Sequence, residues 1–267
     1  MAESDPAALD APDPEPPPYL TGPPPAGFGQ CPRCPYGTTG PFLRCYDCAS
    51  ETIRTPAADN CPVCHLALDS PDAACWNRLC RSPTRKFDGT YVIGVKAGEL
   101  EKTIWQLKYG TWDGRWGWGV IHARIVLGYL YTHPDVLDGV AAIIPTPGLW
   151  TTHRGAPRRD YVGWVIEKAI EQDDQGLPFV LDPPLIEKTG ETKRMRETAG
   201  MWERDAVGHQ LKAALHVPDP SRLRGRTIMV YDDVFTTGTT LNAIAGKLKS
   251  AGAAKVYGLT LARQPRR

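Results

Sequence analysis

The sequence predicts an α/β protein in which a small cysteine-rich module precedes a domain built on a parallel sheet. All eight cysteines lie between residues 31 and 80, a region with few aliphatic side chains. From about residue 87, strand-like segments alternate with helix-like segments, which indicates a parallel sheet with right-handed crossovers. The 267 residues suffice for one sizeable domain and one small module, and the hydrophobic share of 42% is ordinary for a globular protein.

The first 30 residues are predicted to form a disordered tail. They contain nine prolines, five acidic residues and no lysine or arginine, so they cannot bury enough apolar surface to fold. Because five of the 30 acidic residues lie in this tail, the remainder carries 31 basic against 25 acidic side chains. That excess of positive charge suits an anionic ligand.

The sequence shows no targeting or membrane-spanning segment. Its start, MAESDPAALD, has no basic residue, and no apolar h-region follows. No run approaches the roughly 20 apolar residues that a spanning helix needs. We therefore expect a cytoplasmic protein without membrane insertion, in which cysteines are more often metal ligands than disulfides.

The elements of the second domain are predicted in order from their apolar patterns. A short apolar run such as GVAAII, residues 139–144, is typical of a buried parallel strand. Apolar residues three or four positions apart, such as Leu100, Ile104 and Leu107, indicate one face of a helix. The predicted strands cover residues 91–95, 139–144, 227–231 and 256–261. The predicted helices lie around residues 100–107, 120–131, 161–170 and 239–248.

The stretch TIMVYDDVFTTGTT, residues 227–240, places an acidic pair at the end of a strand and a hydroxyl-rich loop after it. Ligands bind at the carboxyl edge of open parallel sheets. The helix predicted to begin near Thr239 exposes unpaired N–H groups and the positive end of its dipole, and Gly238 lets the backbone approach an anion. Asp232 and Asp233 would repel a phosphate, but they can accept hydrogen bonds from a vicinal diol. The stretch therefore predicts a ribose 5-phosphate site.

The same stretch resembles the phosphoribosyl-pyrophosphate (PRPP) signature of type I phosphoribosyltransferases, which has apolar residues, two acids and a T-T/S-G-x-T loop. The resemblance implies that Asp232 and Asp233 face the 2′ and 3′ hydroxyls of the ribose. It also implies that the 5′-phosphate is cradled by Thr236, Thr237, Gly238, Thr239 and Thr240. The alternative is a capped strand–turn–helix that binds no ligand.

The cysteines form three C-x2-C pairs followed by two further cysteines. One such pair supplies two thiolates to a tetrahedral ion, and a second pair completes the site. Sequential pairing predicts two structural zinc sites, which leave no open position for catalysis. Crossed pairing, replacement of a ligand by His65, and reduced cysteines without metal are the alternatives. The predicted ligand sets are Cys31, Cys34, Cys45 and Cys48, and then Cys61, Cys64, Cys75 and Cys80.

A cysteine module before a phosphoribosyltransferase-like domain resembles the competence-protein ComF family, which is linked to DNA uptake. Three further features carry this resemblance: Lys108-Tyr109, Pro145-Thr146-Pro147 and His153-Arg154-Gly155. The chain departs from the family's R-G-F-N-Q segment, because Ala156-Pro157-Arg158 follows Gly155. The predicted boundaries are a tail over residues 1–30, a zinc module over 31–86 and a phosphoribosyltransferase-like domain over 87–267.

Several basic and small residues are candidates for the pyrophosphate end of the ligand. The resemblance to the transferases implies that the loop after Ile144 holds pyrophosphate and that the polar segment 187–198 is a mobile hood. Lys193 and Arg194 are the predicted catalytic residues of this hood, and Arg196 lies beside them. Lys108 is a predicted anion contact at the end of a helix. The candidates in the loop are Thr146, Gly148, His153, Arg154, Arg158 and Arg159, with Arg154 preferred.

The predicted function is transfer of the phosphoribosyl group from PRPP to an unknown acceptor, with magnesium on the pyrophosphate and structural zinc in the module. The alternative is a non-catalytic nucleotide sensor associated with single-stranded DNA or with DNA-uptake proteins. Interleaved aromatic and basic residues suit base stacking, although such tryptophans also pack between domains. These tryptophans are Trp105, Trp112, Trp116 and Trp118.

Overall fold

The structure is a computed structural model that describes residues 53–109, 112–148, 151–153, 156–158, 160–192 and 201–266. The side chains of residues 112–117, 151–153, 156–158 and 201–205 are outside this description. The predicted tail and the first predicted zinc site, from Cys31 to Cys48, also lie outside the described residues.

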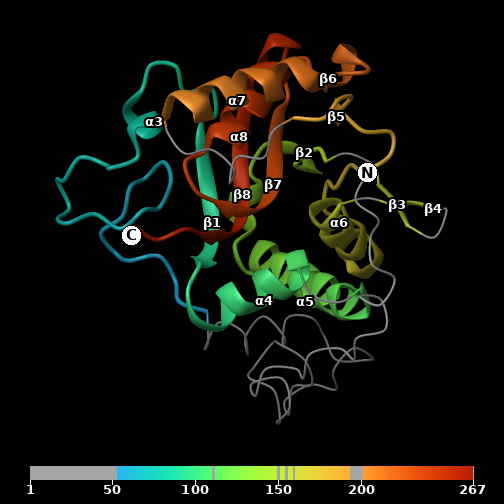
Figure 1. The fold of residues 1–267 in the computed structure, drawn as a ribbon, viewed down its shortest axis with the longest axis horizontal. Helices are drawn as coiled ribbons and strands as arrows, with labels where there is room; N and C mark the ends of the chain where they lie inside the picture. Colours follow the sequence, from blue (N-terminus) through green and yellow to red (C-terminus); the bar gives the residue numbers. More distant parts are fainter. Residues whose placement is uncertain are drawn as a thin grey trace, which may run out of the picture.

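The centre of the fold is a four-stranded parallel sheet with the order β1-β8-β7-β2. The strands are β1 (Gly89–Val95), β2 (Val140–Pro145), β7 (Thr227–Phe235) and β8 (Lys255–Arg263). The four predicted strands are thus confirmed, and so is the parallel sheet. Figure 1 shows the strands running side by side through the middle of the molecule.

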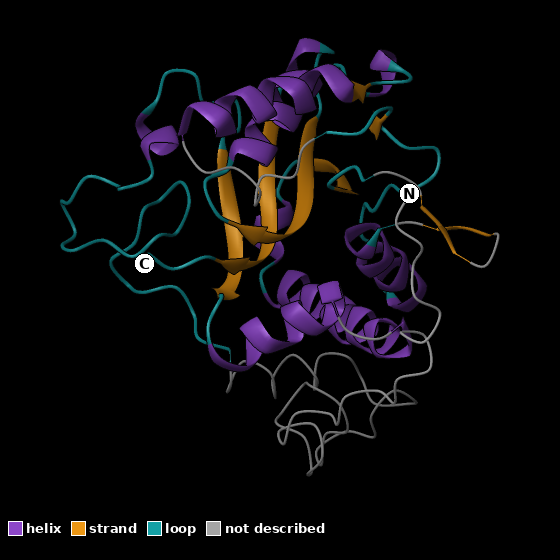
Figure 2. Ribbon diagram, in the orientation of Figure 1, coloured by secondary structure: helices purple, strands orange, loops and turns teal. Residues whose placement is uncertain are grey.

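Helices cover both faces of the sheet (Figures 1 and 2). On one face lie α4 (Gly98–Tyr109), α5 (Trp112–Thr132) and α6 (Tyr161–Gln172). On the other face lie α7 (Met201–Ala214) and α8 (Thr239–Ser250). The helices predicted from apolar spacing are confirmed, whereas α7 was not predicted.

Side chains of β7 alternate between the two layers of core, as the twofold period of a strand requires. Met229 and Tyr231 pack into the core with α4, α5 and α6. Ile228 and Val230 pack into the core with α7 and α8. Asp233 lies on the side of α4, where it pairs with Lys108. Val234 then packs against the first core and Phe235 lies in the second, so the strict alternation ends at the acidic pair.

Strand β7 is longer than predicted, and this difference creates the site described below. It pairs with β8 from Thr227 to Phe235, but β2 pairs with it only as far as Tyr231. The amide of Thr146 donates to the carbonyl of Tyr231 at 2.8 Å and ends this ladder. Residues 232–235 therefore stand beyond the end of β2, which leaves a notch at the carboxyl edge of the sheet.

The remaining elements are short. They include two antiparallel strand pairs that were not predicted. The pair β3–β4 lies within the loop predicted to hold pyrophosphate, and the pair β5–β6 includes the start of the predicted hood. The short elements are α3 (Arg78–Arg81), η2 (Pro134–Leu137), β3 (Thr151–His153), β4 (Ala156–Arg158), β5 (Glu187–Lys188), β6 (Leu215–His216) and η4 (Pro220–Arg222).

The described part of the cysteine module shares its core with the sheet. Cys61, Cys64, Cys75 and Cys80 belong to the same apolar cluster as Phe235 on β7. Three hydrogen bonds join the described part of the module to β1. His65 Nε2 lies 2.7 Å from the Thr90 carbonyl, Thr90 Oγ1 donates to the Val63 carbonyl at 2.8 Å, and the Val95 amide donates to the Arg54 carbonyl at 2.7 Å. The boundary at residue 87 stays a prediction. Among the described residues, no helix is long and apolar enough to cross a membrane.

Candidate functional site

The acidic pair occupies the part of β7 that extends beyond β2. Asp233 is buried, with 4% of its surface exposed, and its carboxylate forms an ion pair with Lys108 at the end of α4. Asp232 lines the hollow on the other face of the strand, together with Val230 and Val234. The structure thus brings both acids to the predicted edge, but it directs only Asp232 into the hollow.

Burial raises the pKa of Asp232 to about 8, and the neighbouring charge of Asp233 adds to the rise. The positive charge of Lys108 acts in the opposite direction. Asp232 therefore holds a proton through much of the neutral range, whereas Asp233 has its counter-charge beside it. The arrangement limits the negative charge that the edge presents.

The loop after β7 has the geometry of an anion site at a helix start. Gly238 precedes the first turn of α8 and has a φ of 83°, in the left-handed region that favours glycine. A Cβ atom at this position would lie 2.5 Å from Cζ of Phe235, so the position has no space for a side chain. The hydroxyls of Thr237 and Thr239 lie 3.0 Å apart at the N-terminus of α8.

Asp232 and the loop line a common hollow that is partly open to solvent. Its wall combines the hydroxyls of the loop, the carboxyl of Asp232 and Thr146 from the end of β2. Backbone N–H groups at the start of α8 have no partner within the helix and are directed toward an incoming anion. The lining residues are Thr146, Val230, Asp232, Val234, Phe235, Thr236, Thr237, Gly238, Thr239, Thr240, Leu241, Gly258 and Thr260.

A second hollow lies beside the first and shares Thr146 with it. Its walls are largely apolar and include Leu181 and Ile186. Asp160 also lines it and accepts a hydrogen bond from the Gly163 amide at 2.9 Å, as the N-cap of α6. Burial raises the pKa of Asp160 to about 6.

The other predicted residues are distributed as follows. Gly148 lines the second hollow, and Lys108 is engaged with Asp233 and lies 5.4 Å from the Tyr161 ring. Trp105 is exposed on α4, whereas Trp118 is buried. Outside the described residues or side chains lie Trp112, Trp116, His153, Arg154, Arg158, Arg159, Lys193, Arg194 and Arg196.

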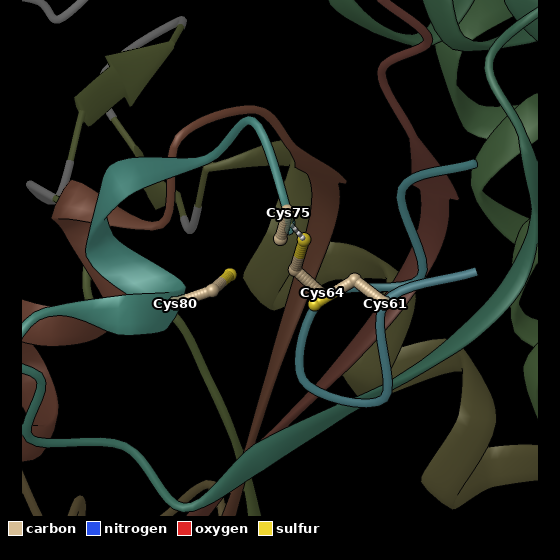
Figure 3. A group of neighbouring side chains, drawn as sticks. All are labelled: Cys61, Cys64, Cys75 and Cys80. Atoms are coloured by element: carbon tan, nitrogen blue, oxygen red, sulfur yellow. Dashed lines mark hydrogen bonds between the residues drawn. The ribbon is translucent and has the colours of Figure 1, made fainter. Parts of the chain in front are cut away.

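The cysteines of the second predicted zinc site come together as one buried cluster (Figure 3). Their sulfur atoms all lie within 4.8 Å of one another, and Cys64 Sγ lies 3.7 Å from Cys75 Sγ. A tetrahedral zinc site with Zn–S bonds of about 2.3 Å has sulfur–sulfur separations of about 3.8 Å. The four side chains therefore fit a structural metal ion such as zinc.

The surroundings of the cluster also suit a metal-thiolate centre. The amides of Val63 and Asn77 donate to Cys61 Sγ and Cys75 Sγ, each at 3.4 Å. Such donors stabilise thiolates and orient them toward an ion. His65, which we had considered as a substitute ligand, instead directs Nε2 at the Thr90 carbonyl and is not among the clustered ligand atoms.

Without a metal, the thiol of Cys64 is more acidic than those of Cys75 and Cys80. A hydrogen bond from Cys80 and the charge of Arg263 lower the pKa of Cys64 to about 4. Burial raises the pKa of Cys75 to about 12, and donation to Cys64 raises the pKa of Cys80. Cysteines bind metal as thiolates, so metal binding is expected to release protons from Cys75 and Cys80.

Three residues of the site were missed by the sequence analysis. Phe235 fills the space under Gly238, Arg263 donates to the carbonyls of the loop, and Asn77 donates to the Thr237 carbonyl. Arg263 is 27 residues from Thr236, and Asn77 is 160 residues from Thr237. A buried arginine at the end of an apolar strand, as in LTLAR, is the one local signal that could have indicated Arg263.

No protein-family model matches the chain, and a search of curated proteins finds no similar sequence. The class that the fold and the site define is therefore an α/β protein with a parallel sheet, a four-cysteine cluster that could hold a metal, and a hollow at the sheet edge.

Proposed function

We propose that the protein has a type I phosphoribosyltransferase fold, binds PRPP with magnesium and transfers the phosphoribosyl group to an acceptor nucleophile. One observation carries this proposal: the hollow unites the helix start at Gly238 with the carboxyl of Asp232. Membership of the ComF family, zinc as the ion in the cysteine cluster and a cytoplasmic location belong to the same proposal.

The phosphate end of the ligand is assigned to the loop. The N-terminal N–H groups of α8 and the hydroxyls of Thr237 and Thr239 are donors, and the helix dipole favours a negative charge at this end. The wall beneath them includes Val230 and Gly258, which offer no carboxylate to oppose the anion.

The ribose end of the ligand is assigned to Asp232. This carboxyl lies in the same hollow, at the end of β7, and it can accept hydrogen bonds from ribose hydroxyls. A divalent cation nearby would favour its ionised form, because an opposite charge lowers a carboxyl pKa. Asp233 contributes through its ion pair with Lys108, which sets the position of β7 against α4.

In the proposed reaction the acceptor nucleophile forms a bond to C1 of the ribose, and the bond from C1 to the pyrophosphate oxygen breaks. Pyrophosphate leaves with the electron pair of that bond, and the acceptor loses its proton to the surrounding water. A magnesium ion bound with PRPP would supply charge neutralisation at the leaving group. The protein supplies position and electrostatic stabilisation, with Lys193 and Arg194 proposed to act on pyrophosphate.

Calorimetric titration of ribose 5-phosphate, plain ribose and PRPP with magnesium tests the proposal. Thr237→Val should weaken ribose 5-phosphate binding about tenfold, since a charge-assisted hydrogen bond contributes about 1.5 kcal/mol. Thr132→Val, at the end of α5, removes a hydroxyl that bonds to the Gly128 carbonyl far from the loop and serves as the matched control. Failure of the wild-type protein to bind PRPP or ribose 5-phosphate at millimolar concentration would refute the proposal.

One observation favours the second candidate function, binding of single-stranded DNA. Trp105 and Tyr109 are exposed neighbours on α4, with ring centroids 5.7 Å apart, and exposed aromatic rings can stack on bases. Titration of tryptophan fluorescence with an oligothymidylate tests this function. Salt-dependent quenching that Trp105→Ala abolishes would support it, and quenching unchanged by Trp105→Ala would count against this surface.

A further inference from the structure

We infer that the cysteine cluster and the phosphate-binding loop are one coupled unit, in which Arg263 and Asn77 are positioning residues that hold the loop on the metal centre. Each of these side chains, or the backbone beside it, contacts a cysteine sulfur on one side and a loop carbonyl on the other. The two connections are independent of each other, because they come from different parts of the chain.

The first connection runs through Arg263 at the end of β8. Its Nη2 donates to Cys64 Sγ at 3.7 Å, and its Nη1 donates to the carbonyls of Phe235 and Thr236 at 2.9 and 2.8 Å. The side chain is buried, with 4% exposed, and its guanidinium lies 5.1 Å from the centre of the Phe235 ring. A guanidinium has a fixed fork of donors, so a shift of Cys64 displaces the donors of the loop.

The second connection runs through Asn77, the N-cap of α3. Its backbone amide donates to Cys75 Sγ at 3.4 Å, and its side-chain Oδ1 accepts from the Leu79 amide at 3.2 Å. Its Nδ2 donates to the carbonyl of Thr237 at 3.1 Å, and Cys80 follows within the same short helix. The backbone of Asn77 is therefore held by the cysteine cluster, and its side-chain amide holds the loop.

The two contacts hold consecutive peptide units of the loop. Arg263 donates to the carbonyls of Phe235 and Thr236, and Asn77 donates to the carbonyl of the next residue, Thr237. Peptide units whose carbonyls are fixed in this way have N–H groups in a fixed direction. The start of α8 follows at once, so a metal-loaded cluster orders the donors that face the hollow.

This arrangement predicts reciprocal coupling. If metal binding raises the affinity of the loop for an anion by some factor, the anion must raise the affinity for the metal by the same factor. A coupling of about tenfold is expected, within the range of roughly 5 to 150-fold that is typical of coupled sites. The ligand part of this expectation rests on the proposed function, whereas the ordering of the loop does not.

The first experiment measures amide hydrogen exchange in the full-length, metal-loaded protein. Asn77→Ser keeps a capping oxygen for α3 but is too short to reach the Thr237 carbonyl. Arg263→Lys keeps the positive charge but loses the fork of donors. Both variants should accelerate exchange about tenfold in peptides that cover residues 233–245 while retaining the metal. The matched controls are Asn60→Ser and Arg222→Lys, whose side chains donate to carbonyls away from the loop.

The second experiment uses cobalt in place of the native metal, because cobalt–thiolate absorption reports on the cysteine environment. Adding ribose 5-phosphate should shift this absorption in the wild-type protein, and the shift should be lost in Asn77→Ser. In an equilibrium competition with a chelator, saturating ribose 5-phosphate should also raise the affinity of the protein for cobalt about tenfold, the same factor by which bound metal raises the affinity for ribose 5-phosphate.

The outcomes separate the coupling from the proposed function. Unchanged exchange over residues 233–245 in both positioning variants, with metal retained, would overturn the coupling even if PRPP binds. A wild-type protein that binds no phosphoribosyl ligand would refute the proposed function, and faster exchange in the two variants would still support the coupling. Equal acceleration in the control variants would overturn it as well.

Discussion

The four cysteines and the residues that flank the loop at the end of β7, Phe235 and Leu241, belong to the same apolar core. The two regions differ in whether their polar groups are buried or face solvent. The cluster is closed: its four cysteines are buried and their sulfur atoms face one another. The loop is open: its hydroxyls and the N–H groups at the start of α8 face a hollow that solvent enters. Burial therefore constrains the side chains of the closed region, whereas the open region leaves polar groups in contact with solvent.

The largest expected effect comes from replacing a cysteine of the four-cysteine cluster. Cys64→Ser removes a ligand at the centre of the cluster, so bound zinc should fall by one equivalent per chain. The melting temperature should fall by more than about 10 °C, because structural zinc contributes strongly to the folding of small modules. Metal analysis and thermal unfolding measure both effects, with Asn60→Ser as the neighbouring control. A wild-type protein purified without metal and equally stable would contradict the assignment.

The second largest effect concerns the ion pair between Lys108 and Asp233. Lys108→Met leaves the buried carboxylate of Asp233 without its counter-charge, which is expected to destabilise the protein by about 3–5 kcal/mol. The double variant Lys108→Met with Asp233→Asn should recover most of this loss. Denaturant unfolding of the two variants measures it, and equal stability of both would show that the pair does not act as a unit.

The third effect compares two glycines that share a left-handed conformation. Gly238→Ala should cost about 1 kcal/mol more than Gly225→Ala, because a Cβ atom meets Phe235 only at the first of these positions. Gly238→Ala should also weaken ribose 5-phosphate binding, whereas Gly225→Ala should leave it unchanged. Denaturant unfolding measures the difference in stability, and calorimetry measures the difference in ribose 5-phosphate affinity. Equal losses of stability in the two variants would show that the contact with Phe235 does not matter.

The smallest effect is a pH dependence. The pKa of Asp232 is raised to about 8 in the folded protein, against about 3.9 in an unfolded chain. The folded state therefore binds more protons between pH 4 and pH 8, so stability falls as the pH rises through this range. Asp232→Asn should raise the melting temperature at pH 8 and leave it nearly unchanged at pH 4. An equal change at both values would contradict the raised pKa.

The sequence predicted the sheet, the helices around it and the loop because these depend on local patterns. Apolar runs identified β2, β7 and β8, and the residues around Gly238 identified a helix start. The spacing of the last four cysteines grouped them correctly, because C-x2-C pairs restrict their own geometry. The coarse prediction of an α/β fold with a parallel sheet is thus confirmed.

The prediction failed where the outcome depends on residues far apart in the chain. The end of β2 was predicted to within one residue, but β7 continues four residues past its predicted end because it stays paired with β8 to Phe235. The ion pair of Asp233 with Lys108, 125 residues away in the chain, was not predicted, whereas Asp232 lines the hollow. Arg263 and Asn77 reach the loop from 27 and 160 residues away, so only the packed structure could reveal their contacts.

The pairing of Lys108 with Asp233 has a consequence for the ligand that the edge of the sheet can accept. Two ionised carboxylates beside a helix start would cancel much of its attraction for a dianion. The lysine neutralises one of them from the far side of the sheet, and burial keeps a proton on the other at neutral pH. The edge is thus close to electrically neutral before a ligand arrives. A displacement of α4 that withdrew Lys108 would return a full negative charge to this edge and act as electrostatic repulsion on any phosphate bound there.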